Sequence, residues 1–356
     1  MARNKGVRGT TTDSTDKVTL EIEGQQVTCT NLTKTLYPQT RFTKAEVIDY
    51  YVRVAPFILP HLRDRPVTLK RYPDGVTGEA YWEKDAPSFT PEWVETFPVP
   101  RRSDGPDINY ILIQNTATLV WAANAAALEL HPFLHRVPDI EQPTSIVFDL
   151  DPGEGAALTE CITIALLIKD VMEELRLTIF AKVSGSKGLQ LYVPLNTATS
   201  YAITQPFARA IAEFIEKREP TLAVAEMPKA KRAGKVFIDW SQNADHKTTV
   251  GIYSLRAKRH EPFVSMPVSW DELEVALKQK KTDGLYFDPK AALARLEKRG
   301  DLFAPVQSLK QSLPPDLAHV IDTSSNSCKS SGPEEKRRSE MFTKNSSSTA
   351  RLPTQL

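Results

Sequence analysis

The chain has 356 residues, 41% of them apolar, so it can bury a substantial core in one large domain or two packed lobes. Its 45 Lys and Arg residues nearly balance 44 Asp and Glu residues, which leaves a formal net charge of +1. Binding of nucleic acid by overall charge is therefore excluded, and such a role would need a local basic face.

Cysteine usage and hydropathy indicate a cytoplasmic protein. Cys29, Cys161 and Cys328 are far apart, show no CxxC spacing and leave an odd count, which favours a reducing compartment over a disulfide framework. Residues 1–16 contain no apolar signal-peptide core, and no stretch approaches the roughly 18–20 apolar residues of a membrane span. We expect neither secretion nor membrane insertion.

The predicted elements begin with an unstructured arm over residues 1–16, which are rich in Thr, Gly and charge and show no periodicity. Residues 18–30 (VTLEIEGQQVTCT) then predict a hairpin that turns at Gly24. Residues 43–59 predict a helix, because Thr43 and Glu46 form a capping box ahead of an apolar pattern of helical period.

Strands outnumber helices in the rest of the folded part, which we expect to end near residue 306. Strands are predicted over 67–72, 108–113, 145–151, 177–184, 188–195, 235–240 and 248–255. Helices are predicted over 115–127, 156–175, 205–217, 270–279 and 289–298. Because strands and helices do not alternate strictly, the pattern favours an α+β fold of mixed sheets with helices outside. Residues 307–356, rich in Ser and Lys, predict a disordered tail.

Three carboxylates stand where apolar strands end. Asp149 and Asp151 are two residues apart in a strand, so they project to one face, and Asp239 ends a second apolar strand. Oxygen ligands of this kind suit Mg²⁺ or Mn²⁺, and two ions about 3.5–4 Å apart support nucleotidyl transfer. Without metal ions, mutual repulsion is expected to raise the pKa values of the acids. The alternative is a simple strand-end turn at Asp151-Pro152-Gly153.

An anion site is predicted in the segment VSGSKGLQLYVPL, residues 183–195. It bends through two glycines and presents Ser184, Ser186 and Lys187, so backbone N–H groups and the lysine can cradle a phosphate. The alternative is an ordinary hairpin with a charged tip. The segment is not a Walker motif, because no GxxxxGK[ST] leads into a helix.

Other basic residues are candidates for balancing the negative charge of the acids and of a bound phosphate. Arg232 precedes the strand of Asp239, and Arg256 directly follows the predicted strand over 248–255. His131 is a candidate for a phosphate contact. A zinc site formed by His131 and His135 is not expected, because Pro132 interrupts the helix that would align their rings.

Several segments, in this order and combination, resemble one known family. They are NLTKTLYP, TKAEVIDYY, RPVTLKRYPDG, LELHP, VFDLDPGEG, SGSKGLQLYVPL, KVFIDWSQN and KTTVGIYSLRA. Over roughly residues 17–305 the chain is similar to the polymerase domain of bacterial DNA ligase D, in the archaeo-eukaryotic primase superfamily. Since no ligase motif follows and no phosphoesterase module precedes, we expect a stand-alone form.

The resemblance implies a core of two packed mixed or antiparallel β-sheets flanked by helices. It implies a DNA-end-binding part over about 17–130 and a catalytic part over about 131–306. The implied activity is template-guided addition of nucleotides, with ribonucleotides preferred, at DNA ends and gaps with a downstream 5′-phosphate during non-homologous end joining. The implied cofactors are two Mn²⁺ or Mg²⁺ ions, with NTPs or dNTPs as substrates.

Partners and location follow from the same resemblance. DNA ends and gapped duplex are the expected ligands, and the Ku end-binding protein and a separate ATP-dependent DNA ligase are the expected protein partners. We expect a monomer, able to pair with a second copy across a DNA break, in a bacterial cytoplasm near the nucleoid.

Residue roles carry over from matching positions. By the resemblance, Asp149, Asp151 and Asp239 hold the metal ions, with Asp239 also close to the attacking 3′-hydroxyl. The implied nucleotide-binding residues are Lys70, His131, Ser184, Lys187, Gly188, Arg232 and Arg256. The implied template-stacking residues are Tyr81 and Trp82. The implied pocket for the downstream 5′-phosphate is formed by Asn31, Lys34 and Lys44.

The 5′-phosphate pocket is also expected on physical grounds, because Lys44 lies in the first turn of the predicted helix. Free N–H groups at that helix start would add to the charge of the ammonium. The alternative is a lysine that covers apolar surface with its stem.

One position departs from the family pattern. Many relatives have His where this chain has Gln190, which neither titrates near neutral pH nor carries positive charge. Gln190 therefore favours a rival function, a catalytically weakened module that binds or bridges DNA ends and recruits Ku and ligase. A metal phosphohydrolase is a third possibility, but it leaves Lys34, Lys44 and Trp82 without a role. Primer extension with Mn²⁺ separates the first two functions.

Overall fold

A computed structural model of the chain describes residues 7–13, 17–258 and 260–314. The chain divides into two units, Met1–Leu313 and Pro314–Leu356, and the described helices and strands all lie in the first. In the described ranges, no helix combines the length and the apolar character that crossing a membrane requires.

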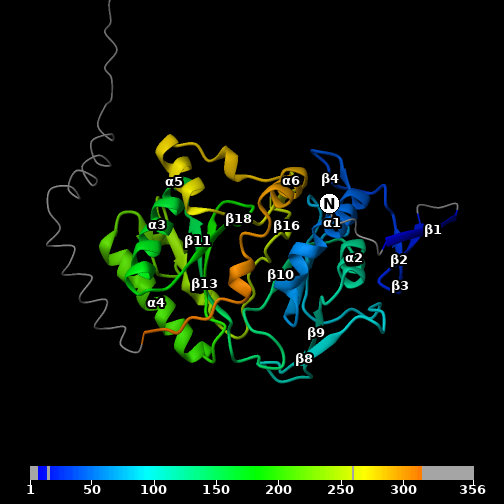
Figure 1. Cartoon of the computed structure of the whole chain (residues 1–356), viewed down its shortest axis with the longest axis horizontal. Helices are drawn as coiled ribbons and strands as arrows, with labels where there is room; N and C mark the ends of the chain where they lie inside the picture. Colours follow the sequence, from blue (N-terminus) through cyan, green and yellow to red (C-terminus); the bar gives the residue numbers. More distant parts are fainter. Residues whose placement is uncertain (1–6, 14–16, 259, 315–356) are drawn as a thin grey trace, which may run out of the picture. The chain divides into compact units, whose positions relative to one another are not determined.

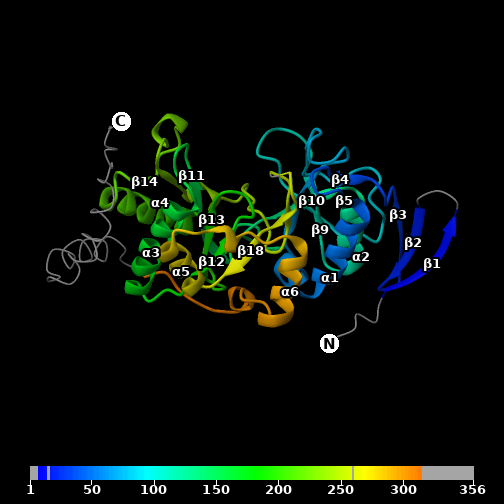
Figure 2. The ribbon, with the colours of Figure 1, turned by 90° about the horizontal axis from the view of Figure 1, so that it is seen from above.

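The larger sheet has six strands in the order β14-β15-β11-β13-β12-β18 (Figures 1 and 2). The central strand β11 (Ser145–Pro152) is antiparallel to both neighbours, β13 (Leu189–Pro194) and β15 (Val236–Asp239). β12 (Phe180–Val183) and β18 (Met266–Val268) lie beyond β13, and β14 (Ala223–Val224) runs parallel to β15. The helices α3 (Leu158–Glu174) and α4 (Tyr201–Arg218) both pack against β11.

The smaller sheet has the order β10-β6-β9-β8, with β7 also paired to β6. Its strands are β6 (Pro66–Arg71), β7 (Tyr81–Glu83), β8 (Thr96–Val99), β9 (Ile108–Leu112) and β10 (Ala127–Pro132). The helices α1 (Lys44–Leu62) and α2 (Thr116–Asn124) pack against each other beside it. Two sheets flanked by helices form the α+β architecture that the sequence predicts.

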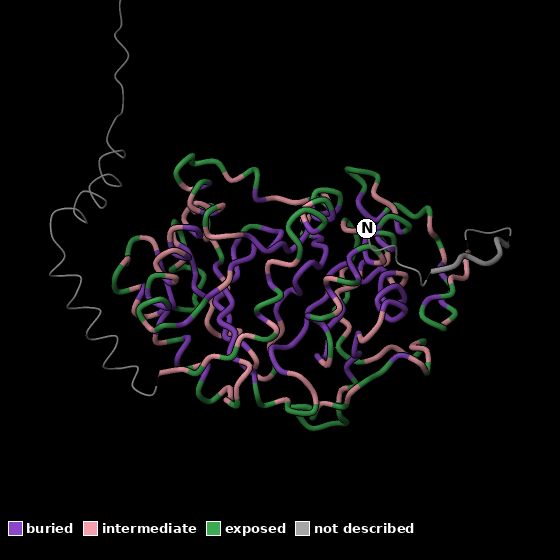
Figure 3. The backbone as a smooth tube through the Cα atoms, in the orientation of Figure 1, coloured by how far each residue is buried: buried purple, intermediate pink, exposed green. Residues whose placement is uncertain are grey.

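Short elements complete the described part of the chain. A small sheet contains β1 (Val7–Asp13), β2 (Lys17–Ile22) and β3 (Gln25–Thr30). Two further pairs are β4 (Thr35–Tyr37) with β5 (Phe42–Thr43), and β16 (Leu255–Arg256) with β17 (Phe263–Val264). The remaining helices are α5 (Trp270–Gln279), α6 (Pro289–Arg299) and the 3-10 turns η1 (Lys229–Lys231), η2 (Trp240–Gln242), η3 (Asp283–Leu285) and η4 (Ala304–Gln307). The central strands of both large sheets are largely buried, and many of the surrounding loops are exposed (Figure 3).

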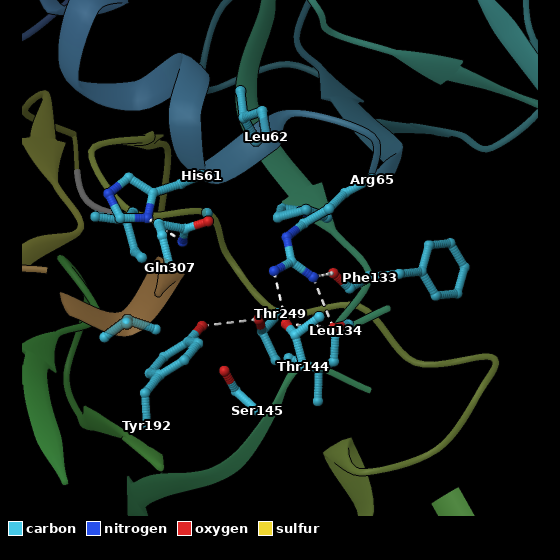
Figure 4. Close-up of a pocket in the computed structure, with 14 residues that line it drawn as sticks. His61, Leu62, Arg65, Phe133, Leu134, Thr144, Ser145, Tyr192, Thr249 and Gln307 are labelled. Atoms are coloured by element: carbon cyan, nitrogen blue, oxygen red, sulfur yellow. Dashed lines mark hydrogen bonds between the residues drawn. The ribbon is translucent and has the colours of Figure 1, made fainter. Parts of the chain in front are cut away.

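The two large sheets meet at a seam around Arg65 (Figure 4). The Arg65 guanidinium donates to Leu134 O (2.6 Å) and Thr144 Oγ (2.7 Å), on the segment between β10 and β11. Tyr192 Oη, on β13, lies 3.0 Å from Thr249 Oγ. The cavity between them measures about 30 Å³, far below the roughly 300–1,000 Å³ of pockets that bury small ligands. The seam is therefore a structural joint with no room for a nucleotide.

Local sequence signals predict several elements correctly. The capping box is present, because Thr43 Oγ accepts from Glu46 N and the Glu46 carboxylate accepts from Thr43 N. The hairpin of β2 and β3 turns at Gly24, whose φ of +83° suits glycine.

The strand predicted over 248–255 is wrong except at its last residue, which begins β16. Gly251 N donates to Leu130 O (2.7 Å), and a Cβ at Gly251 would lie 3.1 Å from the same carbonyl. Tyr253 has a φ of +64°, which ends any extended run. The segment crosses β10 closely instead of continuing as a strand.

Both terminal predictions need correction where the structure describes the chain. Val7–Asp13 forms β1 and pairs with β2, because its threonines favour strand structure and β2 offers a free edge. The rest of the arm predicted over 1–16 lies outside the described residues. The folded part also extends past 306, since Gln311 Nε2 donates to Pro194 O (2.7 Å) and Gln311 N donates to Leu195 O (2.8 Å). Residues 315–356 of the predicted tail lie outside the described residues.

Replacing Gln311 by Ala is expected to lower the free energy of unfolding by roughly 1–3 kcal/mol, since the side chain also bonds both backbone groups of Thr178 (2.6 and 3.0 Å). The exposed neighbour Lys310 provides the matched control, and Lys310→Ala should change the value by less than about 0.5 kcal/mol. Urea unfolding of the two variants and the wild type measures these changes in the free energy of unfolding. Equal midpoints would show that the domain ends before this residue.

Candidate active site

Strand register brings polar residues of four strands into one row across the larger sheet. Asp239 of β15 is paired with Asp149 of β11, Asp149 with Gln190 of β13, and Gln190 with Lys182 of β12. Directly paired residues of antiparallel strands share a face, with Cβ atoms about 4.5–5.5 Å apart. Asp151 lies two residues beyond Asp149 and therefore shares that face. We call Asp239, Asp149, Gln190 and Lys182 the polar row.

Asp149 and Asp151 have raised pKa values, although burial, and not the mutual repulsion expected from the sequence, is the largest cause. Burial, followed by the charge of Asp151, raises the pKa of Asp149 to about 7; Asp239 adds to this effect, and a hydrogen bond from Gln190 and the charge of Lys182 oppose it. Desolvation raises the pKa of Asp151, where Lys258 opposes the shift and Asp239 adds to it. A cation placed between these carboxylates would remove the repulsion.

The three carboxylates are of the type that binds hard divalent cations, and they share one face of the sheet. Their oxygen atoms do not yet converge on a single point. Asp239 accepts hydrogen bonds from Ser241 N (3.0 Å), Ser241 Oγ (2.6 Å) and Gln242 Nε2 (2.7 Å). Among the described residues, no group of three or more His, Cys, Asp or Glu side chains is already set to hold a metal ion. A metal ion could contact Asp239 at Oδ2, which accepts a hydrogen bond from Gln242, either beside that bond or in its place.

A buried carboxylate, Glu129 on β10, organises basic groups near the acids. Its Oε2 lies 2.9 Å from His131 Nε2, and its Oε1 accepts from Ala257 N (2.9 Å) and lies 3.6 Å from Arg256 Nε. Burial works to raise the pKa of Glu129, but the hydrogen bond from His131 and the charge of Arg256 lower it to about 2. Glu129 therefore holds two of the residues assigned to the triphosphate. Sequence patterns do not single out Glu129, because it lies inside the apolar strand LELHP.

The loop Ser184–Gly188 packs tightly between the acids and Arg256. A Cβ at Gly188 would lie 2.0 Å from Leu150 O, and a Cβ at Gly185 would lie 2.7 Å from Arg256 Cγ. Lys187 at the tip is exposed. The N–H groups of Ser186 and Gly188 both point to Ser184 Oγ at 3.3 Å, so two donors predicted for an anion are used inside the loop.

Arg232 lies close to the second acid. Its guanidinium stacks 3.6 Å from the centroid of Phe237, the residue paired with Asp151, and donates to Met227 O. The charges of Lys258 and Arg232 both act to lower the pKa of Asp151. Lys258, which is not among the predicted site residues, is thus a further basic residue near Asp151.

Lys70, Trp82 and His131 form a second group next to Glu129. Trp82 is paired with Lys70, whose Nζ lies 4.8 Å from the indole centroid, and the His131 ring is also 4.8 Å away. Trp82 and Tyr81 are about half exposed, at 53% and 46%. Trp82 and Gln242 line a cavity of about 540 Å³, large enough for a nucleotide. An exposed ring beside a cation, as at Trp82, suits stacking of nucleic-acid bases.

Asn31, Lys34 and Lys44 gather at the start of α1, but its N–H groups are not free. Lys44 N donates to Lys34 O (2.9 Å), Ala45 N to Leu32 O (3.0 Å), and Glu46 N to Thr43 Oγ. The expectation of free helix N–H groups is therefore wrong, because the preceding loop folds back over the helix start. Lys44 is buried, and its Nζ donates to Thr30 O (2.8 Å). Lys34 is exposed beside Asp74, at 3.1 Å.

The two helix-flanked sheets, with an acidic strand end beside basic residues, agree with the architecture that the resemblance to a primase-polymerase domain implies. A family model described as LigD, primase-polymerase domain, matches residues 43–303. The chain belongs to this family.

Relatives with the same domain support this membership. The multifunctional non-homologous end joining protein LigD of Mycolicibacterium smegmatis is 43% identical over 286 residues, covering 80% of this chain and 36% of that protein. The bifunctional LigD of Bacillus subtilis is 32% identical over 249 residues, covering 70% and 39%. The chain thus spans little more than a third of these relatives. A solved polymerase domain from Mycobacterium tuberculosis ligase D in complex with DNA matches 81% of this chain and 100% of its own, with a TM-score of 0.74 and 37% identity.

Proposed function

We propose that this chain is a metal-dependent polymerase that adds nucleotides to DNA ends and gaps during non-homologous end joining. The observation that best supports this proposal is the pairing of Asp149 with Asp239, which places acids distant in sequence on one face next to Asp151. Family membership supports the polymerase class. The names of the relatives, and the DNA bound to the solved mycobacterial domain, support the pathway and the substrate.

In this proposal Asp149, Asp151 and Asp239 hold two Mn²⁺ or Mg²⁺ ions. Such ions, when bound, lower the pKa of a primer 3′-hydroxyl and stabilise leaving pyrophosphate. The chain itself supplies the geometry: the sheet fixes the acids, and Glu129 fixes His131 and Arg256 for contact with the triphosphate. The remaining nucleotide contacts come from Lys70, Ser184, Lys187, Gly188 and Arg232.

Template DNA would stack on the exposed rings of Trp82 and Tyr81, of which Trp82 lines the 540 Å³ cavity. The expected preference for ribonucleotides, and the expected partnership with Ku and a separate ATP-dependent ligase, belong to the same proposal and rest on the family resemblance.

Primer extension on a gapped duplex with Mn²⁺, offered each ribonucleotide and deoxyribonucleotide in turn, tests this function. We expect templated extension by the wild type. The variant Asp283→Asn, at an exposed acid of η3, should extend equally well. Wild-type protein that binds the duplex but extends no primer would contradict the proposal and favour the end-binding module suggested by Gln190.

Lys34→Ala is expected to reduce the preference for a 5′-phosphorylated gap over an unphosphorylated one by about fivefold, or roughly 1 kcal/mol, because an exposed charge contact is lost. Competition binding with the two gapped duplexes measures this ratio. Lys290→Ala, at an exposed lysine of α6, is the matched control. An unchanged ratio in Lys34→Ala would place the phosphate pocket elsewhere.

A further inference from the structure

The chain leaves the central ladder of the larger sheet directly after Asp239. Register pairs Asp149 of β11 with Asp239 of β15, and an extension of the same antiparallel ladder would pair Val147 with Ser241. The chain instead turns into η2, where the Ser241 N–H donates to Asp239 Oδ1 at 3.0 Å. The backbone groups of Val147, a fully buried residue, therefore need another partner.

The side chain of Asn243 is that partner. Its Oδ1 accepts from Val147 N at 2.8 Å, and its Nδ2 donates to Val147 O at 2.7 Å. The same Nδ2 donates to Trp240 O, inside η2, at 2.9 Å. The side chain is buried, at 0% exposure. These contacts use both N–H donors of the amide and fix its orientation, because the backbone N–H can only donate and the two carbonyls can only accept.

The Asn243 amide thus joins β11 to the turn that holds the carboxylate of Asp239. Within this turn Ser241 Oγ donates to Asp239 Oδ1 at 2.6 Å, and Gln242 Nε2 donates to Asp239 Oδ2 at 2.7 Å. Because β11 also carries Asp149, the placement of the Asp239 carboxylate relative to Asp149 depends on where η2 is held.

We propose that Asn243 is a positioning residue for Asp239. It takes the place of a ladder residue on β11 and holds η2, so that the Asp239 carboxylate stays on the face that it shares with Asp149. The contacts require an amide: Asp would lack the donors for the two carbonyls, and Ala would leave both backbone groups of Val147 without a partner. The effect on activity rests on the proposed function, in which Asp239 is a metal ligand.

Hydrogen exchange of single amides, followed by NMR without metal ions, tests the link without any activity. In the wild type we expect the N–H groups of Val147 and Ser241 to be protected at least about 100-fold. In Asn243→Ala both should lose at least about tenfold of this protection, while Phe148, paired with Leu191 of β13, keeps its own. A Ser241 N–H that exchanges freely in the wild type, or that is unaffected by Asn243→Ala, would overturn the inference.

Primer extension measures the consequence for catalysis. We expect Asn243→Ala to lower kcat by about 10- to 100-fold and to raise the half-saturating Mn²⁺ concentration at least about fivefold, because Asp239 is held less firmly. The KM for nucleotide should stay within about threefold of the wild type, because the residues assigned to the triphosphate are unchanged. A normal kcat with a normal Mn²⁺ response would refute the positioning role.

Gln311→Ala is the matched control, because the Gln311 amide also bonds both backbone groups of one residue, Thr178, just before β12. It should lose stability but keep all three kinetic values within about twofold of the wild type. Equal kinetic losses in the two variants would show that Asn243→Ala acts through stability alone, which contradicts the inference. Wild-type protein that extends no primer would contradict the proposed function instead, and hydrogen exchange would then decide the role of Asn243.

Discussion

Replacing Asp149 by Asn is expected to abolish primer extension and, at the same time, to stabilise the folded chain above pH 7. The activity is lost because a carboxylate of the acid face is gone. The stability rises because the charged form of Asp149 is disfavoured in the fold: burial and the charges of Asp151 and Asp239 raise its pKa from 3.8 to about 7.

The sign of the pH dependence follows from this shift. A raised pKa means that the folded chain binds the proton more tightly, so the stabilising contribution is complete below pH 3.8 and is lost as the pH rises through 7. Asn does not titrate, so the advantage of the variant should grow from near zero at pH 4 to roughly 2–4 kcal/mol at pH 8.

Urea unfolding at pH 4.5, 6 and 8, in the absence of divalent ions, measures this advantage beside the extension assay. Asp283→Asn serves as the control and should follow the wild type at each pH. An Asp149→Asn variant that extends primers would contradict the catalytic role of Asp149. A variant that gains no stability between pH 4.5 and 8 would contradict its raised pKa.

Glu129→Gln should have the second large effect, because it leaves Arg256 without its buried counter-charge and His131 without its carboxylate hydrogen-bond partner. Removing one partner of a buried ion pair costs roughly 3–5 kcal/mol of stability. We also expect kcat/KM for the nucleotide to fall at least about 100-fold, or roughly 2.7 kcal/mol, since both basic residues lose their support.

The pH dependence runs opposite to that of Asp149. The pKa of Glu129 is lowered from 4.5 to about 2, so its contribution is complete above pH 4.5 and is lost as the pH falls toward 2. The stability gap between wild type and variant should therefore be wide at pH 7 and narrow toward pH 3. Glu83→Gln, which loses a carboxylate paired with Arg71 on the same sheet, is the control for kcat/KM. Equal nucleotide kinetics in Glu129→Gln and the wild type would contradict the supporting role.

Features set by neighbouring residues could be predicted from the sequence. The capping box at Thr43 and the shared face of Asp149 and Asp151 need only helix and strand periodicity. The convergence of Asp239 with Asp149 depends on strand register between segments about 90 residues apart. The sequence indicated it through a second apolar strand that ends in an acid, and the family resemblance supported it.

The remaining features could not be predicted, because they depend on tertiary contacts. Glu129 and Lys182 lie within apolar strands, and nothing local shows that their partners are Arg256 and Ser265. The loop carbonyls of Leu32 and Lys34 take the first N–H groups of α1, which no helix-start signal reveals. Close approach to β10 likewise prevents the TTVGIYSL segment from forming the strand that its composition favours.

The central claim is that Asp149, Asp151 and Asp239 together bind divalent ions beside a nucleotide. Crystals grown with Mn²⁺ and a non-hydrolysable nucleoside triphosphate, recorded at a wavelength where manganese scatters anomalously, test it most directly. The account predicts anomalous peaks within bonding distance of all three carboxylates. Nucleotide bound with no manganese at these acids, or manganese bound at another cluster, would contradict it.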